Sequence, residues 1–289
     1  MDTAATRIAV LYHPAKAGAA ETAERIASTI AQLGLGTTGA LSLRDIDPAA
    51  VRGCSLAIVV GGDGSILGAA RLCAPLAIPL LTVQLGRLGL LAEVEAHDID
   101  AALPYYLHGD CWRDARLMLA ATLDDGADGL DGRVLALNDM VVARGVSSGP
   151  IRVDVTLGGE RYGTVWADGL IVATPTGSSA YTRSAGGPIV HPAVASLSLT
   201  AVAPQSGPPQ LLVIPADESV GLRVTTDASN WVLLADGLVH ALPVSGTTVT
   251  VRRASHEAVF LRRGDRYRLQ RRLRELLVGD PRPRLGVSG

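Results

Sequence analysis

The chain has 289 residues, of which 48% are hydrophobic and 19% charged, with a net charge of −2. This composition excludes a disordered protein, and the length allows one large domain or two smaller ones. No apolar run reaches the ~20 residues needed to span a bilayer, and the N-terminus lacks the features of a secretion signal. We therefore expect a cytoplasmic protein with no membrane partner.

The cysteines, lysines and histidines limit which metal, disulfide and phosphate-binding sites the chain could form. The three cysteines, Cys54, Cys73 and Cys111, are an odd number and lack Cys-x-x-Cys spacing. They are therefore expected to be reduced thiols, and neither a disulfide framework nor a zinc site is predicted. The single lysine, Lys16, is followed by alanine, whereas a P-loop requires Gly-Lys-Ser/Thr. The histidines show no metal-ligand spacing. A P-loop is therefore excluded, and no protein ligand for a metal is assigned.

The first 115 residues alternate strands with helices. Strands are predicted at 7–12, 56–60 and 78–83, a helix at 20–33, and a short helix after the second strand. Such alternation is typical of parallel βαβ units, whose ligands bind at the carboxyl ends of the strands. We expect residues 1–115 to form a Rossmann-like α/β domain with a parallel sheet.

The following residues contain many short predicted strands separated by turn signals. These strands are expected at 116–123, 134–137, 151–157, 160–165, 169–173, 211–214, 220–225, 231–235, 247–253 and 258–262. This pattern predicts a β-rich, sandwich-like second domain over residues 116–262.

The C-terminal segment is basic, because residues 252–289 contain 11 arginines and four acidic residues. Leucines recur among these arginines at helical spacing, at 269, 273, 276 and 277. A basic tail can bind nucleic acid. We favour instead an amphipathic helix at 263–289 that returns to the acidic N-terminal domain.

The stretch Gly61-Gly62-Asp63-Gly64-Ser65 follows a five-residue apolar run that predicts a buried strand. Glycines beside a helix N-terminus expose N–H groups that bind phosphate. A carboxylate among phosphates is repelled unless it binds a metal or accepts a proton, and phosphoryl transfer to a hydroxyl uses both roles. Gly-Asp-Gly is also an ordinary turn sequence, so the motif alone leaves the function open.

Two further stretches carry polar groups suited to a nucleoside. Asn138-Asp139 pairs an amide with a carboxylate between apolar runs. The run DGLIVATPTGSSAY at 168–181 combines an acid, a buried strand, a hydroxyl-rich loop and the flat ring of Tyr181. Each also has a structural interpretation: Asn-Asp is a common turn pair, and the hydroxyls of the second stretch can cap a helix at 179–185.

Taken in order, GGDGS at 61–65, LND at 137–139, DGLIVATPTGSSAY at 168–181 and SAGGPIVHP at 184–192 resemble the NAD kinase family. IPLLTVQLGRLGLL at 78–91 also looks like that family. The resemblance implies phosphorylation of the adenosine 2′-hydroxyl of NAD to give NADP. ATP or polyphosphate would be the donor, with Mg²⁺ or another divalent metal carried by ATP. It also implies a homodimer or homotetramer and no nucleic-acid partner.

The resemblance assigns roles residue by residue. Asp63 would be the general base, or the group that orients the 2′-hydroxyl. The phosphate-donor turn would be formed by Gly61, Gly62, Gly64 and Ser65. The residues that would bind NAD are Asp63, Gly64, Asn138, Asp139, Asp168, Ser179, Ala180, Tyr181, Ser184 and Ala203.

Several positions depart from the family pattern. The conservative ones are Asp139 for the usual glutamate, Ser65 and Ser179 for threonine, and Leu90 for phenylalanine. Gln84 replaces asparagine, Gln205 replaces histidine and Leu238 replaces glutamine, all near the expected pocket edge. These three positions motivate one alternative, a non-catalytic dinucleotide-binding paralogue. The glycine turn leaves a second alternative open, another hydroxyl kinase, for a lipid or a sugar phosphate, that uses the same turn.

Overall fold

A computed structural model describes residues 7–86, 89–124, 134–145, 149–208, 211–225, 231–241 and 246–264. The chain divides into two compact units. The first contains Met1–Ala69, Pro79–Asp114 and Phe260–Gly289, and the second contains Ala70–Ile78 and Ala115–Val259.

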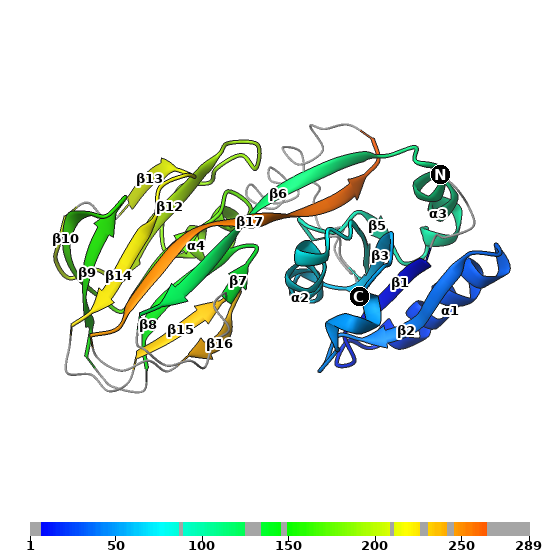
Figure 1. Ribbon diagram of the computed structural model, residues 1–289, viewed down its shortest axis with the longest axis horizontal. Coiled ribbons are helices and arrows are strands. Elements are labelled where there is room, and N and C mark those ends of the chain that lie inside the picture. The colour runs from blue at the N-terminus through cyan, green and yellow to red at the C-terminus, as the bar shows by residue number, and fades with distance from the viewer. Residues whose placement is uncertain are drawn as a thin grey trace, which may run out of the picture. The chain divides into compact units, whose positions relative to one another are not determined.

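The first unit is built on a parallel sheet. Its strands lie in the order β4 (Leu80–Gln84), β3 (Leu56–Gly61), β1 (Arg7–Tyr12) and β2 (Gly36–Ser42), and β5 (Val94–Glu95) pairs with β4. Every neighbouring pair is parallel, as the βαβ pattern predicted. The carboxyl ends of β3 and β4 therefore lie at the same edge of the sheet (Figure 1).

Two helices pack in this unit because one face of each is apolar. Helix α1 (Ala19–Gln32) buries Ala23, Ile26 and Ile30 at helical spacing and contacts β1 and β2. Helix α3 (Ile99–His108) buries Leu103 and Tyr106 and ends at a glycine with positive φ. These side chains and the strand residues form one core.

A buried ion cluster holds the end of the last strand in the first unit. Arg262 pairs with Glu93 (Nη1–Oε2, 3.3 Å) and with Asp114 (Nε–Oδ2, 3.2 Å). Glu93 Oε1 also accepts hydrogen bonds from the Arg263 N–H at 2.9 Å and from the Tyr106 hydroxyl at 3.1 Å. A buried charge requires such partners, so loss of one member would leave an uncompensated charge.

The second unit contains two antiparallel sheets. One has the order β10 (Glu160–Ala167), β9 (Ile151–Leu157), β14 (Val220–Val224) and β17 (Thr248–Arg262), with β6 (Trp112–Leu123) pairing with β17 and with β7 (Val134–Ala136). The other has the order β13 (Leu211–Pro215), β12 (Ser196–Val202), β11 (Gly169–Ala173), β8 (Asp139–Arg144), β15 (Trp231–Ala235) and β16 (Leu238–Ala241). This arrangement confirms the predicted β-rich fold.

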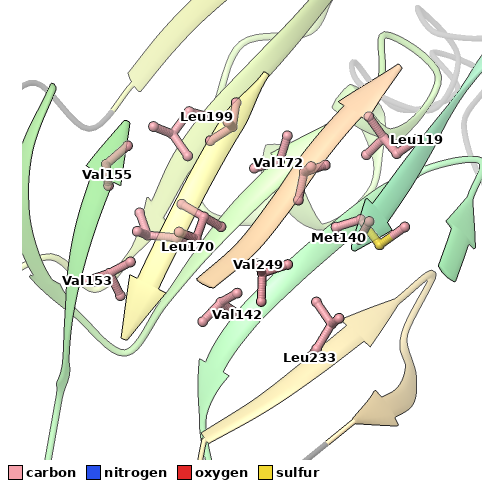
Figure 2. Packing of buried hydrophobic residues seen from close by; sticks show 14 of the residues in the cluster. Leu119, Met140, Val142, Val153, Val155, Leu170, Val172, Leu199, Leu233 and Val249 are labelled. Carbon is pink, nitrogen blue, oxygen red and sulfur yellow. The ribbon is translucent and has the colours of Figure 1, made fainter. Parts of the chain in front are cut away.

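The core of the second unit contains side chains from both sheets. Figure 2 shows Leu119 and Val249 from the first sheet with Met140, Leu170 and Leu199 from the second, and all five are buried. The other face of the second sheet carries a smaller cluster in which Val141 and Ile171 pack against Ala185. The segment after β11 therefore covers part of that outer face.

Several elements differ from the sequence expectations. The pattern missed β2, β5, α3, β8, β12 and β16. The strands expected at 247–253 and 258–262 are one continuous strand, β17. The helix expected at 179–185 is a 3₁₀ turn, Gly177–Ser179, followed by the single helical turn α4 (Tyr181–Ser184). Most of the predicted arginine-rich helix at 263–289 lies outside the described residues.

Candidate functional site

The glycine turn joins β3 directly to helix α2 (Asp63–Cys73). The N–H groups of Ser65 and Ile66 donate to the Gly62 carbonyl at 2.9 and 3.1 Å, which closes the first helical turn on Gly62. Gly61 has no room for a side chain, because a Cβ atom there would overlap the Ser65 hydroxyl. The turn thus presents a helix N-terminus at the carboxyl edge of the parallel sheet, a place that favours an anion.

Asp63 is the first residue of α2, and its carboxylate lies against Gly89. A Cβ atom on Gly89 would overlap Asp63 Oδ1. Gln84, at the end of β4, is buried, and its Nε2 lies 3.9 Å from the position of a Cβ on Gly62. Gln84 Oε1 has no hydrogen-bond partner among the described residues. The Gln84 side chain and the Asp63 carboxylate therefore both lie beside the glycine turn.

The Asn138-Asp139 pair leads into β8 in the second unit. The carbonyl of Asn138 accepts from the Thr174 N–H at 2.9 Å, and the carbonyl of Leu137 accepts from the Thr174 hydroxyl at 2.6 Å. Gly177 packs on the Asn138 backbone, where a Cβ would overlap the carbonyl group. These contacts bring the Asn138-Asp139 turn and the loop after β11 together.

Asp139 is a buried carboxyl whose pKa is raised to about 7. Burial is the main cause, because it disfavours the charged form, and the neighbouring Asp236 carboxylate adds to it. Because side chains alternate along a strand, Asp139 and Val141 lie on the same face of β8, away from the core between the sheets. That face is the one covered by the segment after β11.

The loop after β11 is held by its own hydroxyl groups. Ser178 Oγ donates to the Pro175 carbonyl at 2.6 Å and accepts from the Val190 N–H at 2.9 Å. Ser179 Oγ donates to the Thr176 carbonyl at 3.2 Å. Tyr181 is 45% exposed, so its ring is accessible to a ligand. Ser184 closes the short helix through its N–H, which donates to the Ala180 carbonyl at 3.4 Å.

Asp168 and Ala203 lie at the opposite end of β11 from Asp139. Ala173 pairs with Asp139, whereas Gly169 pairs with Val202, which precedes Ala203. Five residue steps along the strand separate the two ends by about 17 Å. The Asp168 carboxylate pairs there with Arg144 (Nε–Oδ2, 3.2 Å). The predicted dinucleotide residues of the second unit thus form two groups.

Ala203 has a positive φ of 45°, which is unusual for a residue with a side chain. The nearby Gln205 N–H donates to the Trp166 carbonyl at 2.8 Å. Leu238 is 53% exposed at the start of β16. Leu238 therefore presents apolar surface at a place where the resemblance expected an amide.

Sequence reasoning missed two charged residues next to the Asn138-Asp139 turn, Asp236 and Arg71. Asp236 Oδ1 accepts from the Asn138 N–H at 2.7 Å, and Arg71 Nη1 donates to Asp236 Oδ2 at 2.6 Å. Asp236-Gly237 was visible in the sequence as a turn pair. Its contact with residues about a hundred positions earlier was not.

Two kinds of feature are absent from the described part of the chain. No group of three or more His, Cys, Asp or Glu side chains there is arranged to hold a metal ion. None of the described helices combines the length and the apolar character that crossing a membrane requires. The three cysteines are thiols, and burial raises the pKa of Cys54 and of Cys111.

Solved structures share this fold over nearly the whole chain. A yeast NADH kinase in complex with NADH has a TM-score of 0.82 at 20% identity, covering 97% of this chain and 89% of the other. An NAD kinase from Archaeoglobus fulgidus in complex with ATP has a TM-score of 0.72 at 23% identity, covering 92% and 96%. The chain therefore shares the fold of these two structures.

Sequence relationships identify the family. The model of the ATP-NAD kinase N-terminal domain matches residues 14–111, and that of the C-terminal domain matches residues 137–263. An NAD kinase of Heliobacterium modesticaldum is 45% identical over 217 residues, which cover 75% of this chain and 76% of the relative. The chain belongs to the ATP-NAD kinase family.

Proposed function

We propose that the protein transfers the γ-phosphoryl group of ATP to the adenosine 2′-hydroxyl of NAD, giving NADP and ADP. Membership of the ATP-NAD kinase family supports this reaction. The structural observation that carries the proposal is the Asp63 carboxylate at the N-terminus of α2, beside a glycine turn suited to phosphate. One turn thus combines an anion site for the donor phosphates with a base for the acceptor hydroxyl.

In the proposed mechanism, Asp63 accepts the proton of the 2′-hydroxyl. The hydroxyl oxygen forms a bond to the γ-phosphorus of ATP as the bond to the bridging oxygen breaks, and ADP leaves. The turn formed by Gly61, Gly62, Gly64 and Ser65 binds the donor phosphates through the α2 N-terminus. Gly89 leaves room for the Asp63 carboxylate and limits its movement on that side.

The Asn138 amide and the Asp139 carboxylate hold the dinucleotide in the second unit, with Tyr181 as a flat surface for a ring. Ser179, Ala180 and Ser184 belong to the same proposed site. They follow Thr174 and Gly177, two residues of this loop that contact the Asn138 backbone, which supports the grouping. Asp168, Gly64 and Ala203 complete the set implied by the family resemblance.

Mg²⁺ or another divalent cation accompanies ATP in this proposal. Magnesium usually keeps several waters and binds through substrate phosphates. The glycine turn at the N-terminus of α2 would hold those phosphates, and no carboxylate of the chain is assigned to the cation. When bound, the cation would neutralise charge on the transferred phosphoryl group, and the chain's own contribution is to hold the phosphates and accept the proton.

The defining experiment is a kinase assay with purified protein and magnesium, with NADP formation as the readout. ATP and polyphosphate are compared as donors, and NAD and NADH as acceptors, because related structures bear the names of both NAD and NADH kinases. The expected result is NADP from NAD and ATP. Binding of NAD without turnover would instead favour a dinucleotide-binding paralogue, and turnover of a lipid or sugar phosphate would favour another kinase.

We also propose a cytoplasmic location and assembly as a homodimer or homotetramer. The three thiols are consistent with a reducing compartment. Strand β13 lies at an edge of its sheet and exposes Leu211 (55%) and Val213 (47%). An exposed apolar edge strand is a surface that a second copy of the chain would cover.

A further inference from the structure

Asp236 lies in the tight turn between β15 and β16, and its carboxylate is completely buried. Asp236 and Gly237 both have positive φ, 49° and 78°, as a two-residue hairpin turn requires. A glycine or an asparagine would adopt this backbone as readily as an aspartate. The turn therefore does not explain why a charged group is buried there.

The contacts of the Asp236 carboxylate give that explanation. Oδ1 accepts from the N–H groups of Asn138 at 2.7 Å and Asp139 at 3.4 Å, and Oδ2 accepts from the Leu137 N–H at 3.1 Å. Arg71 Nη1 donates to Oδ2 at 2.6 Å. Three successive backbone amides and one guanidinium thus converge on a single carboxylate, an arrangement that suits a negative charge.

The carbonyl groups of the same three residues are also occupied. The Thr174 hydroxyl donates to the Leu137 carbonyl, and the Thr174 N–H donates to the Asn138 carbonyl. The Asp236 N–H donates to the Asp139 carbonyl at 2.9 Å. The backbone from 137 to 139 is therefore held on both its donor and its acceptor side. This backbone therefore fixes the direction in which the side chains of Asn138 and Asp139 leave the chain.

We propose that Asp236, held in place by Arg71, is a positioning residue for the dinucleotide: it sets the backbone of the Asn138-Asp139 turn and so the direction of both side chains. The inference rests on the proposed role of Asn138 and Asp139 in binding NAD. Asp236 acts through this turn and does not itself contact the substrate.

A charge at position 236 has an electrostatic effect besides its hydrogen bonds. It raises the pKa of Asp139, adding to the effect of burial. Among the described residues, the other titratable or charged groups near this pair are Arg71 on α2 and His240 on β16. The pKa of His240 is lowered by burial and by Arg71. Substitutions at 236 and 71 should therefore change the pH dependence of NAD binding in opposite directions.

The central variant is Asp236→Asn, which keeps the shape of the side chain and the turn. It removes the charge and replaces one acceptor oxygen by a donor that faces backbone N–H groups. Hydrogen bonds to a charged group contribute about 1.5–3 kcal/mol, so the KM and Kd for NAD should rise about 10- to 100-fold. The KM for ATP should stay unchanged. In a plot of NAD affinity against pH, the fall in affinity on the acidic side (the acidic limb) should move to lower pH. The reason is that removing the neighbouring negative charge lowers the pKa of Asp139.

Arg71→Gln is the complementary variant. It leaves the Asp236 charge without its guanidinium partner, so Asp139 ionises less readily and the acidic limb should move to higher pH. Asp217→Asn, which removes an exposed carboxylate from the same unit, is the matched control and should change neither quantity. Calorimetric titration with NAD gives the binding profile without requiring turnover.

A purely structural role for Asp236 predicts a lower melting temperature with an unchanged NAD affinity and pH profile in the folded variant. That result would overturn the proposal, as would shifts of the same sign in Asp236→Asn and Arg71→Gln. If Asp236→Asn does not fold, the sign of the Arg71→Gln shift decides. A wild-type protein that binds NAD without turnover would contradict the proposed kinase reaction and leave the calorimetric comparison intact.

Discussion

Gly89 lies against the carboxylate of Asp63, so closely that a Cβ atom at position 89 would overlap Oδ1. The strand β4, the segment that follows it and the N-terminus of α2 therefore meet at the proposed base. A glycine at position 89 keeps this carboxylate where the glycine turn presents it. We therefore expect the activity to be sensitive to a single methyl group at position 89.

Gly89→Ala should lower kcat about 10- to 100-fold, because a displacement of the base by about 1 Å costs that much. The affinity for NAD should be largely preserved. Gly149→Ala is the matched control, since a Cβ at position 149 meets no atom within 4 Å and the backbone there has no positive φ. Steady-state kinetics with NAD and ATP measure both effects. A loss of NAD affinity with normal kcat would contradict the placement of Asp63.

Asp63→Asn should keep the fold and NAD binding while lowering kcat about 10²- to 10⁴-fold, the usual contribution of a general base. Circular dichroism and calorimetry check the first two properties, and the NADP assay checks the third. Near-normal turnover in this variant would exclude Asp63 as the base.

Gly177→Ala should weaken NAD binding more than it slows phosphoryl transfer. The added Cβ would overlap the Asn138 carbonyl, so the loop after β11 and the Asn138-Asp139 turn must separate. The destabilisation from overpacking is typically about 1–3 kcal/mol, so the melting temperature should also fall. The KM for NAD and a thermal melt measure the two effects. An unchanged KM would show that the loop does not support the dinucleotide site.

The raised pKa of Asp139 predicts a pH dependence of stability. The unfolded carboxyl loses its proton near its ordinary pKa of 3.8, whereas the folded one keeps it to about 7. The folded state binds the extra proton in this interval, so the contribution of Asp139 becomes more destabilising as the pH rises from about 4 to about 7. Asp139→Asn should therefore be more stable than the wild type at pH 8, with a smaller advantage at pH 5. Urea unfolding at both pH values measures this, and an equal advantage at both would contradict it.

Replacing both exposed side chains of β13, Leu211→Glu with Val213→Glu, should reduce the molecular mass of the assembly measured by light scattering. Leu33→Glu, at an exposed apolar position at the end of α1, is the control and should leave the mass unchanged. An unaltered mass in the β13 variant would place the contact between copies elsewhere.

The sequence predicted the elements whose patterns are local and strong. The apolar run of β3 and the 3.6-residue spacing of α1 identify the parallel α/β unit, and the alternation in β9 identifies the antiparallel one. Strand β2 was missed because Gly36-Thr37-Thr38-Gly39 has little apolar character. Helix α3 was missed because it contains Pro104, and proline is disfavoured in a helix interior.

The proposed site was predictable where its residues form a motif and hidden where they act across the chain. The glycine turn and the TPTGSSAY loop are contiguous, so their residue types indicate their chemistry. Asp236 meets Arg71 across 165 residues and Asn138 across 98. No periodicity connects such positions. The pairing of β15 with β8 brings Asp236 close to Asn138, and Arg71 reaches it from helix α2.

The route of the chain between the two units affects how the protein is made. The first unit begins at the N-terminus, yet its sheet gains the pairing of Phe260 with Leu80, and its buried cluster gains Arg262, only from the end of β17. On the ribosome, the whole second unit is synthesised before these residues emerge. The unit that is translated first is thus the last to be completed, and neither unit is one uninterrupted stretch of the chain.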